Sequence, residues 1–348
     1  MEWIFLLLTF LSVSVFAQNK IQPPAWGAYH GAYMDFGATA SEVNREKIRE
    51  YHELAGKKAA WAYFANDWLD GKIVFPRESV NIIESEGLVP YLRLLPWSIM
   101  SAKVTKADPV FNMASLISGK HDKALKEFFL QAREHGPLMM EFGPEVNGDW
   151  FPWNGRWNGG SKRNGYGDPH YPDGPERFRD AFRRVIDISR EAGAHNITWV
   201  FHIDSAKSPH KEWNDVKYYY PGDHYIDWIG ISVFGAQLPD HEWIIFQKKL
   251  KNFVPEIERM QSTRPWLIAE FASIERRNDP NKKAIWIQQA LRSIESGLFR
   301  KVKGITYWHA FGWLANGTAS FRIDSSPQSL LSFRTEIQKP FWLNSLEF

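Results

Sequence analysis

Short apolar stretches rich in β-branched and aromatic residues alternate along the chain with longer amphipathic stretches. The short stretches predict eight strands, at 26–33, 59–64, 88–94, 138–142, 197–203, 226–233, 266–271 and 304–308. The spacing of apolar residues between them predicts helices such as 41–54, 124–135, 175–192, 242–260 and 282–296, and a last helix over 327–338. Alternating strands and helices form a parallel sheet, and eight such strands close into a barrel. The pattern therefore predicts an α/β fold of the (β/α)8 TIM-barrel class.

The first residues, 1–17, form an apolar run that ends in Val15-Phe16-Ala17 and fits a signal peptide. The segment before the run is atypical of a signal peptide, because it contains Glu2 and no Lys or Arg. A membrane anchor is the alternative, but the run is short for a span. We expect cleavage and a secreted or periplasmic protein. No linker, low-complexity tract or repeat interrupts residues 18–348, which are predicted to form a single catalytic domain.

Composition narrows the classes of partner. The 42 basic and 40 acidic residues give a net charge of +2 and are interspersed, so the chain lacks the basic patch of a nucleic-acid-binding protein. Cysteine is absent, which excludes disulfides, thiolate metal sites and a Cys nucleophile. The 17 Trp exceed what a core requires, and flat aromatic rings commonly pack on sugar rings. We expect a monomer that binds a neutral polysaccharide or oligosaccharide, with no membrane span after signal cleavage.

Two carboxylates lie where the active site of a barrel is built, at the carboxyl ends of strands. Glu145 follows the fourth predicted strand, and Glu270 ends the seventh. One buried carboxylate alone is more often part of an ion pair, but a pair on strands four and seven favours chemistry. In retaining glycoside hydrolysis one carboxylate, about 5–5.5 Å from the other, attacks the anomeric carbon while the other protonates the departing oxygen. We predict that Glu270 is the nucleophile and Glu145 the acid/base.

The chain resembles glycoside hydrolase family 26, the β-mannanase family. The matching segments are 119–122, 145–153, 219–223 leading into 226–230, and 269–271. The resemblance covers nearly the whole mature chain and implies a retaining barrel glycosidase with catalytic Glu on strands four and seven. It also implies β-1,4-mannan as the first substrate to test.

Three positions depart from the family pattern. Pro144 stands where mannanases usually carry His, Glu141 where they carry Arg, and Phe234 where a Tyr usually donates a hydrogen bond to the nucleophile. These changes remove donors from the pocket of the −1 sugar. His202, Asp204 and Ser232 are the nearest substitutes by position, and for His202 a purely structural histidine is an equally open interpretation.

Several other residues are predicted to contact substrate. Trp150, Trp153 and Trp157 lie on a loop rich in Gly, Asn and aromatics, residues 147–174, where they can form aromatic platforms. Trp308 ends the eighth strand, where related barrels place the floor of the −1 subsite. Trp97 and Arg93 follow or end an early strand and are further candidates.

Other reactions lack their sequence signatures. There is no H-E-x-x-H, no phosphate-binding glycine loop and no G-x-S-x-G elbow. The acidic residues of the long loop lack the spacing of a calcium loop, so we predict neither a metal nor a cofactor. Two alternatives to a mannanase remain open: the same chemistry on β-1,3-1,4-glucan or β-1,3-xylan, and a carbohydrate-binding barrel that has lost catalysis.

Overall fold

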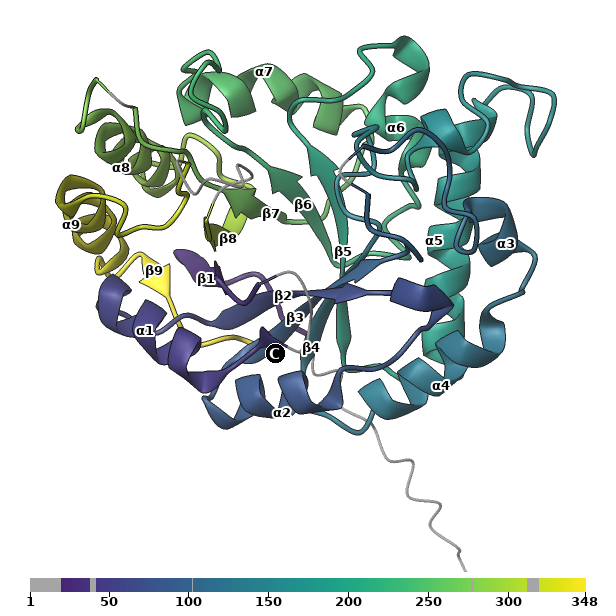
Figure 1. The fold of residues 1–348 in the computed structure, drawn as a ribbon, viewed down its shortest axis with the longest axis horizontal. Coiled ribbons are helices and arrows are strands. Elements are labelled where there is room, and N and C mark those ends of the chain that lie inside the picture. The colour runs from purple at the N-terminus through teal and green to yellow at the C-terminus, as the bar shows by residue number, and fades with distance from the viewer. Residues whose placement is uncertain (1–19, 38–41, 102, 277, 312–318) are drawn as a thin grey trace, which may run out of the picture.

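The computed structural model describes residues 20–37, 42–101, 103–276, 278–311 and 319–348. Within these ranges eight parallel strands close into a barrel, because β1 pairs with both β2 and β8 (Figure 1). The strands are β1 Ala28–Met34, β2 Trp61–Asp67, β3 Val89–Leu95, β4 Leu138–Phe142, β5 Ile197–Asp204, β6 Trp228–Ser232, β7 Trp266–Phe271 and β8 Val302–His309. The predicted fold class and all eight strands are confirmed. The predicted signal peptide lies outside the described residues.

Helices surround the barrel and cover the outer faces of its strands (Figure 1). They are α1 Arg45–Ala55, α2 Arg77–Ser85, α3 Met113–Ile117, α4 Asp122–Ala132, α5 Asp173–Glu191, α6 Val216–Tyr219, α7 Phe246–Glu258, α8 Lys282–Glu295 and α9 Pro327–Ile337. The six predicted helices are present. None of the helices in the described part of the chain is long and apolar enough to cross a membrane.

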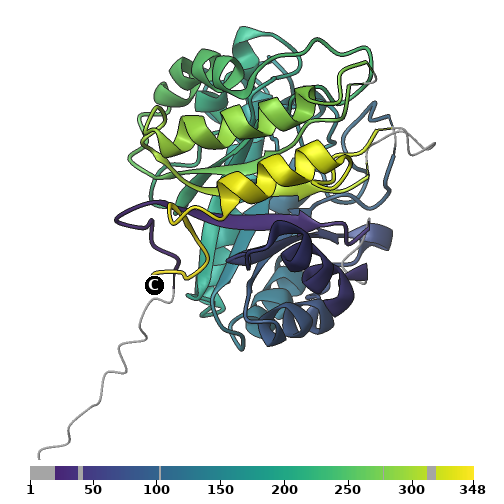
Figure 2. The same ribbon diagram turned by 90° about the vertical axis from the view of Figure 1, so that its left-hand side faces the viewer.

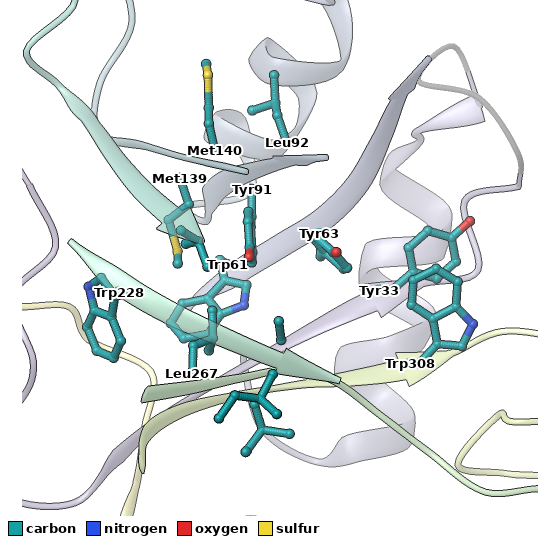
Figure 3. Close-up of a cluster of buried hydrophobic side chains, with 14 of the residues drawn as sticks. Tyr33, Trp61, Tyr63, Tyr91, Leu92, Met139, Met140, Trp228, Leu267 and Trp308 are labelled. Carbon is teal, nitrogen blue, oxygen red and sulfur yellow. The ribbon is translucent and has the colours of Figure 1, made fainter. Parts of the chain in front are cut away.

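The amino-terminal end of the barrel interior is filled by one large side chain, Trp61 of β2 (Figure 3). Gly31 of β1 and Gly304 of β8 make room for the Trp61 ring. A Cβ at Gly31 would lie 2.0 Å from the Trp61 indole nitrogen. That nitrogen donates a 2.9 Å hydrogen bond to the hydroxyl of Thr306. Because side chains alternate along a strand, the next inward position on β2 is Tyr63, one layer closer to the active-site end.

The two ends of the described chain meet at the base of the barrel. A short strand, β9 Trp342–Leu343, pairs with β1, and Gln22 forms an isolated bridge with Glu347. Figure 2 shows α9 lying beside α8 on the outside of the sheet. These contacts close the base and leave the opposite end, where the strands terminate, to form a cavity.

Candidate active site

A cavity of about 750 Å³ opens at the carboxyl ends of the barrel strands. Glu145 and Glu270 both line it, as predicted. Its aromatic lining consists of Tyr33, Trp97, Trp150, Phe151, Phe234 and Trp308. Its charged or titratable lining consists of Asp67, Arg93, Glu145, Asp204, His241, Lys249 and Glu270. Aromatic walls with a few converging polar groups are typical of a site that binds sugars.

Glu145 lies in a tight turn that follows β4. Its φ of 51° is in the left-handed region, which a residue with a side chain adopts only when its surroundings impose it. Two hydrogen bonds fix the turn, from Val146 N to His202 O at 3.3 Å and from Gly148 N to Glu145 O at 2.8 Å. The indole of Trp150 donates a 2.9 Å hydrogen bond to Glu145 Oε2. The carboxylate is thus 7% exposed and faces the cavity.

A strap of hydrogen bonds joins this turn to the end of β5. The Asn147 amide nitrogen donates to Asp204 O at 2.7 Å, and Asp204 N donates to the Asn147 side-chain oxygen at 2.8 Å. Ser208 N also donates to Asn147 O at 3.0 Å. The strap brings Asp204 next to Glu145, and burial together with the negative charge of Glu145 raises the pKa of Asp204.

Glu270 is the second-to-last residue of β7 and is 2% exposed. Arg93 of β3 approaches Glu270 Oε1 at 3.0 Å, and the Tyr63 hydroxyl oxygen lies 2.9 Å from the same Glu270 oxygen. Burial raises the pKa of Glu270 to about 7; the charge of Arg93 opposes this shift and the charge of Glu145 adds to it. Glu270 is therefore a carboxylate with one cation and one hydroxyl fixed against it.

Beneath Glu270 a second, fully buried carboxylate, Glu141, organises the polar residues of the barrel interior. Its Oε1 accepts from Tyr63 at 2.5 Å, and its Oε2 accepts from Tyr91 at 2.6 Å and contacts His202 Nδ1 at 2.9 Å. The other ring nitrogen of His202 lies 2.8 Å from the Ser232 hydroxyl. We call these five residues, Tyr63, Tyr91, Glu141, His202 and Ser232, the Glu141 cluster.

Electrostatics favour an ion pair within the Glu141 cluster. Burial acts to raise the pKa of Glu141, but the charge and hydrogen bond of His202, together with Arg93, outweigh burial and lower that pKa. Burial likewise acts to lower the pKa of His202, and Glu141 reverses this and raises it. The charged forms of both side chains therefore stabilise each other in the barrel interior.

The aromatic walls lie on either side of the carboxylates. Trp308 stacks on Tyr33 with ring centroids 4.2 Å apart and an interplanar angle of 12°, and both are seen together at one side of Figure 3. The Arg93 guanidinium lies 5.2 Å from the Trp308 ring centroid. Across the cavity lining, Trp97 donates a 2.7 Å hydrogen bond to Asp67 and packs 5.7 Å from Phe151.

Of the predicted aromatic platforms, the one at Trp153 is wrong, whereas the one at Trp157 stays a prediction. Trp153 is 1% exposed and donates a 2.8 Å hydrogen bond to Pro144 O, so its ring packs inside the protein instead of meeting a sugar. Trp157 does not line the cavity and stacks under Arg156. The loop folds back because buried amides bind its own carbonyls, as Asn154 does with Val146 O at 2.7 Å. Phe151, which was not predicted, stacks on Trp153 and faces the cavity.

His202 and Ser232 do not reach the cavity either, and the prediction that they contact the sugar directly is wrong. Both lie in the Glu141 cluster, at 2% and 0% exposure. Of the three proposed substitutes for the missing donors, Asp204 alone lines the cavity. Tyr63 and Tyr91 were not among the predicted site residues, although alternation along β2 and β3 points both side chains into the barrel.

One metal-like group occurs among the residues that the structure describes. Single ligand atoms of Glu141, His202 and Glu270 lie within 4.8 Å of one another. The Tyr63 hydroxyl bridges the two carboxylates, and Arg93 supplies a positive charge to both. The negative charge is therefore balanced by side chains of the protein itself, and the absence of a metal requirement stays a prediction.

Comparisons with known proteins agree with this geometry. The model of the family "Glycosyl hydrolase family 26" matches residues 117–257. Endoglucanase H of Acetivibrio thermocellus is 24% identical over 338 residues, which are 95% of this chain and 33% of that protein. The chain thus spans about one third of the length of this curated relative.

Two solved structures share the fold. A family 26 β-mannanase from Bacteroides ovatus has a TM-score of 0.63 at 16% identity, over 92% of this chain and 90% of that one. The catalytic domain of an endo-β-1,4-mannanase from Bacillus sp. JAMB-750 has a TM-score of 0.64 at 14% identity, over 91% and 87% of the two chains. At such identities the likeness concerns the barrel and not the substrate.

Proposed function

We propose that this chain, which belongs to glycosyl hydrolase family 26, cleaves internal bonds of a β-linked polysaccharide with retention of configuration. The observation that carries the proposal is the placement of Glu145 and Glu270, which enter one aromatic-walled cavity from the turn after β4 and from β7. Glycoside hydrolysis by double displacement needs two such groups.

The surroundings of the two carboxylates favour distinct roles. Glu270 is positioned by Arg93 and Tyr63 and acts as the nucleophile in its ionised form. Glu145 carries the proton to the glycosidic oxygen and later removes one from water. When Glu270 bonds to the sugar its negative charge disappears, which removes the repulsion on Glu145 and suits Glu145 to act as a base.

Three substrate backbones can be ranked. Mannan follows from the family resemblance. Glucan is favoured by a specific observation: the relative that aligns with 95% of this chain is named an endoglucanase, whereas the mannanase structures are only 14–16% identical. Pro144 and Phe234 also remove the His and Tyr that mannanases of the family usually carry. We therefore place β-1,3-1,4-glucan first, β-1,4-mannan second and β-1,3-xylan third.

A panel of purified polysaccharides tests the substrate. We expect reducing ends to appear on mixed-linkage β-glucan with an early, broad distribution of oligosaccharides, and the first-formed product to be the β-anomer by proton NMR. Release from mannan alone would reverse the ranking. A protein that binds a glycan tightly but releases no product over days would be a binding barrel and would overturn the proposal.

We also propose that the mature enzyme is exported and monomeric. The apolar run in residues 1–17 supports export. Expression in a bacterial host that secretes proteins, followed by sequencing of the mature amino terminus, tests cleavage after Ala17. Light scattering on the same sample gives the mass in solution.

A further inference from the structure

We propose that Asp204 and Glu145 act as one carboxyl dyad, in which either group can carry the proton that the enzyme exchanges with its substrate. The inference rests on the proposed function and extends it. Asp204 would be a positioning residue for the acid/base, acting through Glu145.

The backbone geometry forces the two side chains together. Asn147, two residues after Glu145, binds both the backbone N and the backbone O of Asp204. The turn also bonds to β5 through Val146 N and His202 O at 3.3 Å. Both carboxyls line the cavity, at 7% exposure for Glu145 and 5% for Asp204. The strap fixes the backbone positions from which both carboxyl groups enter the cavity.

Two neighbouring buried carboxyl groups repel each other when both are charged, so the pair favours a state in which one of them holds a proton. Burial, followed by the negative charge of Glu145, raises the pKa of Asp204 well above its usual value, whereas Lys249 of α7 opposes the shift. The titratable groups that face the pair are Arg93 of β3, His202 of β5, Lys249 of α7, Glu270 of β7 and His241 on the cavity wall. Asp204 also accepts a hydrogen bond from Ala206 N, which fixes one of its oxygens.

The dyad fits the proton balance of both steps. In the first step the proton leaves Glu145 for the glycosidic oxygen, the bond from that oxygen to the anomeric carbon breaks, and a Glu270 oxygen bonds to the carbon. In the second step a water oxygen bonds to the same carbon, the bond to Glu270 breaks, and the water proton passes to Glu145. Between turnovers the proton distributes over Glu145 and Asp204.

A dyad retains its last proton to higher pH than a single carboxyl, because losing that proton leaves two adjacent negative charges. Asp204→Asn preserves the shape and removes the second charge. On the alkaline side of the pH profile, kcat/KM declines as this proton is lost, and we call that decline the basic limb. In the Asp204→Asn variant acting on a polysaccharide, we expect the basic limb to move to lower pH by at least one unit. On an aryl glycoside with a good leaving group, which needs no acid, the limb should move much less.

The matched control is Asp67→Asn. Asp67 is another, partly buried carboxyl of the cavity lining, and it accepts a hydrogen bond from Trp97 instead of lying next to Glu145. Replacing its charge should leave the basic limb of the kcat/KM profile in place to within about 0.3 pH units, whatever the substitution does to KM. An Asp204→Asn limb that does not move, or that moves equally on both substrate classes, would overturn the dyad.

A titration independent of turnover separates failure of the dyad from failure of the proposed function. Carboxyl carbon NMR on protein labelled in its Asp and Glu side chains, assigned with D204N and E145Q, follows Asp204 directly. In E145Q the titration midpoint of Asp204 should fall by about one pH unit or more, because the neighbouring charge is gone. An unchanged midpoint contradicts the dyad even if the enzyme is active, and a lowered midpoint supports it even if no substrate is found.

Discussion

The two glutamates of the cavity are fixed in different ways. Glu270 belongs to a strand and is bound by a cation, Arg93, and a hydroxyl, Tyr63, both from other strands. Glu145 belongs to a turn with a positive φ, and its side chain is bound by an indole and lies next to a carboxyl. Under the proposed mechanism, the first arrangement suits a carboxylate that attacks carbon, and the second suits a group that carries a proton. The same residue type is thus proposed to serve different chemistry in the two places because its partners differ.

Removing each carboxylate should give the largest effects and distinguishes the two roles. Glu270→Ala should lower kcat by about 10⁴-fold or more on every substrate, because no other group can attack the sugar. Glu145→Ala should lower kcat on polysaccharide by about 10²–10⁴-fold. On aryl glycosides with good leaving groups it should retain much of its rate in the first step. Steady-state kinetics on both substrate classes checks this, and the reverse pattern would refute the roles assigned.

Arg93→Met tests the cation that distinguishes the Glu270 side. Burial gives Glu270 a pKa of about 7 even though Arg93 lowers it, so kcat/KM should rise with pH through about 7 as Glu270 ionises. Without Arg93 the pKa of Glu270 rises further. The rise of kcat/KM on the acid side of the pH profile, the acid limb, should therefore move to higher pH by one unit or more. At pH 7 the rate should fall by about 10²-fold.

Arg93→Lys is the matched control for that experiment, because it keeps a positive charge but loses the geometry of the guanidinium. Its acid limb should lie between those of the natural protein and Arg93→Met. An acid limb that stays in place in Arg93→Met would mean that the ion pair does not set the ionisation of Glu270.

Tyr63→Phe and Tyr91→Phe separate positioning of the nucleophile from stability of the Glu141 cluster. Each removes a hydrogen bond to Glu141, so each should lower the free energy of unfolding by about 1–2 kcal/mol. Tyr63 also contacts Glu270, so Tyr63→Phe alone should lower kcat by about tenfold with little change in KM. Urea unfolding and steady-state kinetics give the two quantities, and equal losses of kcat in both variants would contradict a positioning role.

Trp150→Phe should give the smallest effect and concerns the Glu145 side. It keeps an aromatic ring in the cavity but removes the 2.9 Å hydrogen bond to Glu145 Oε2, worth about 1 kcal/mol. We expect kcat on polysaccharide to fall by roughly fivefold, with a smaller fall on aryl glycosides with good leaving groups. A loss confined to KM would show that Trp150 only stacks on the sugar.

The strands were predictable because their apolar runs are local features of the sequence. The predicted ranges 138–142 and 266–271 coincide with β4 and β7. The glutamate that follows β4 and the one near the end of β7 could therefore be assigned to the carboxyl end of the barrel from the sequence alone. The Glu141 cluster was not predicted because it depends on strand register. Arg93 pairs with Glu141 and Tyr63 with Tyr91 only once β2, β3 and β4 are aligned.

The long loop after β4 shows a second limit of sequence reasoning. Its three Trp suggested three platforms, yet Trp150 alone lines the cavity. Side-chain amides such as Asn158, which donates to Pro152 O at 3.0 Å, fold the loop onto itself and bury Trp153. Composition indicates that a loop contains aromatics, but not which of them its own hydrogen bonds turn inward.

Trapping the covalent intermediate tests the central claim most directly. A 2-deoxy-2-fluoro glycoside with a good leaving group should react once with the enzyme, because the fluorine slows the second step. Mass spectrometry of the digested protein should then place the sugar on Glu270, in the peptide that contains β7. A label on Glu145, or rapid hydrolysis of substrate by an enzyme that never accumulates a label, would contradict the account.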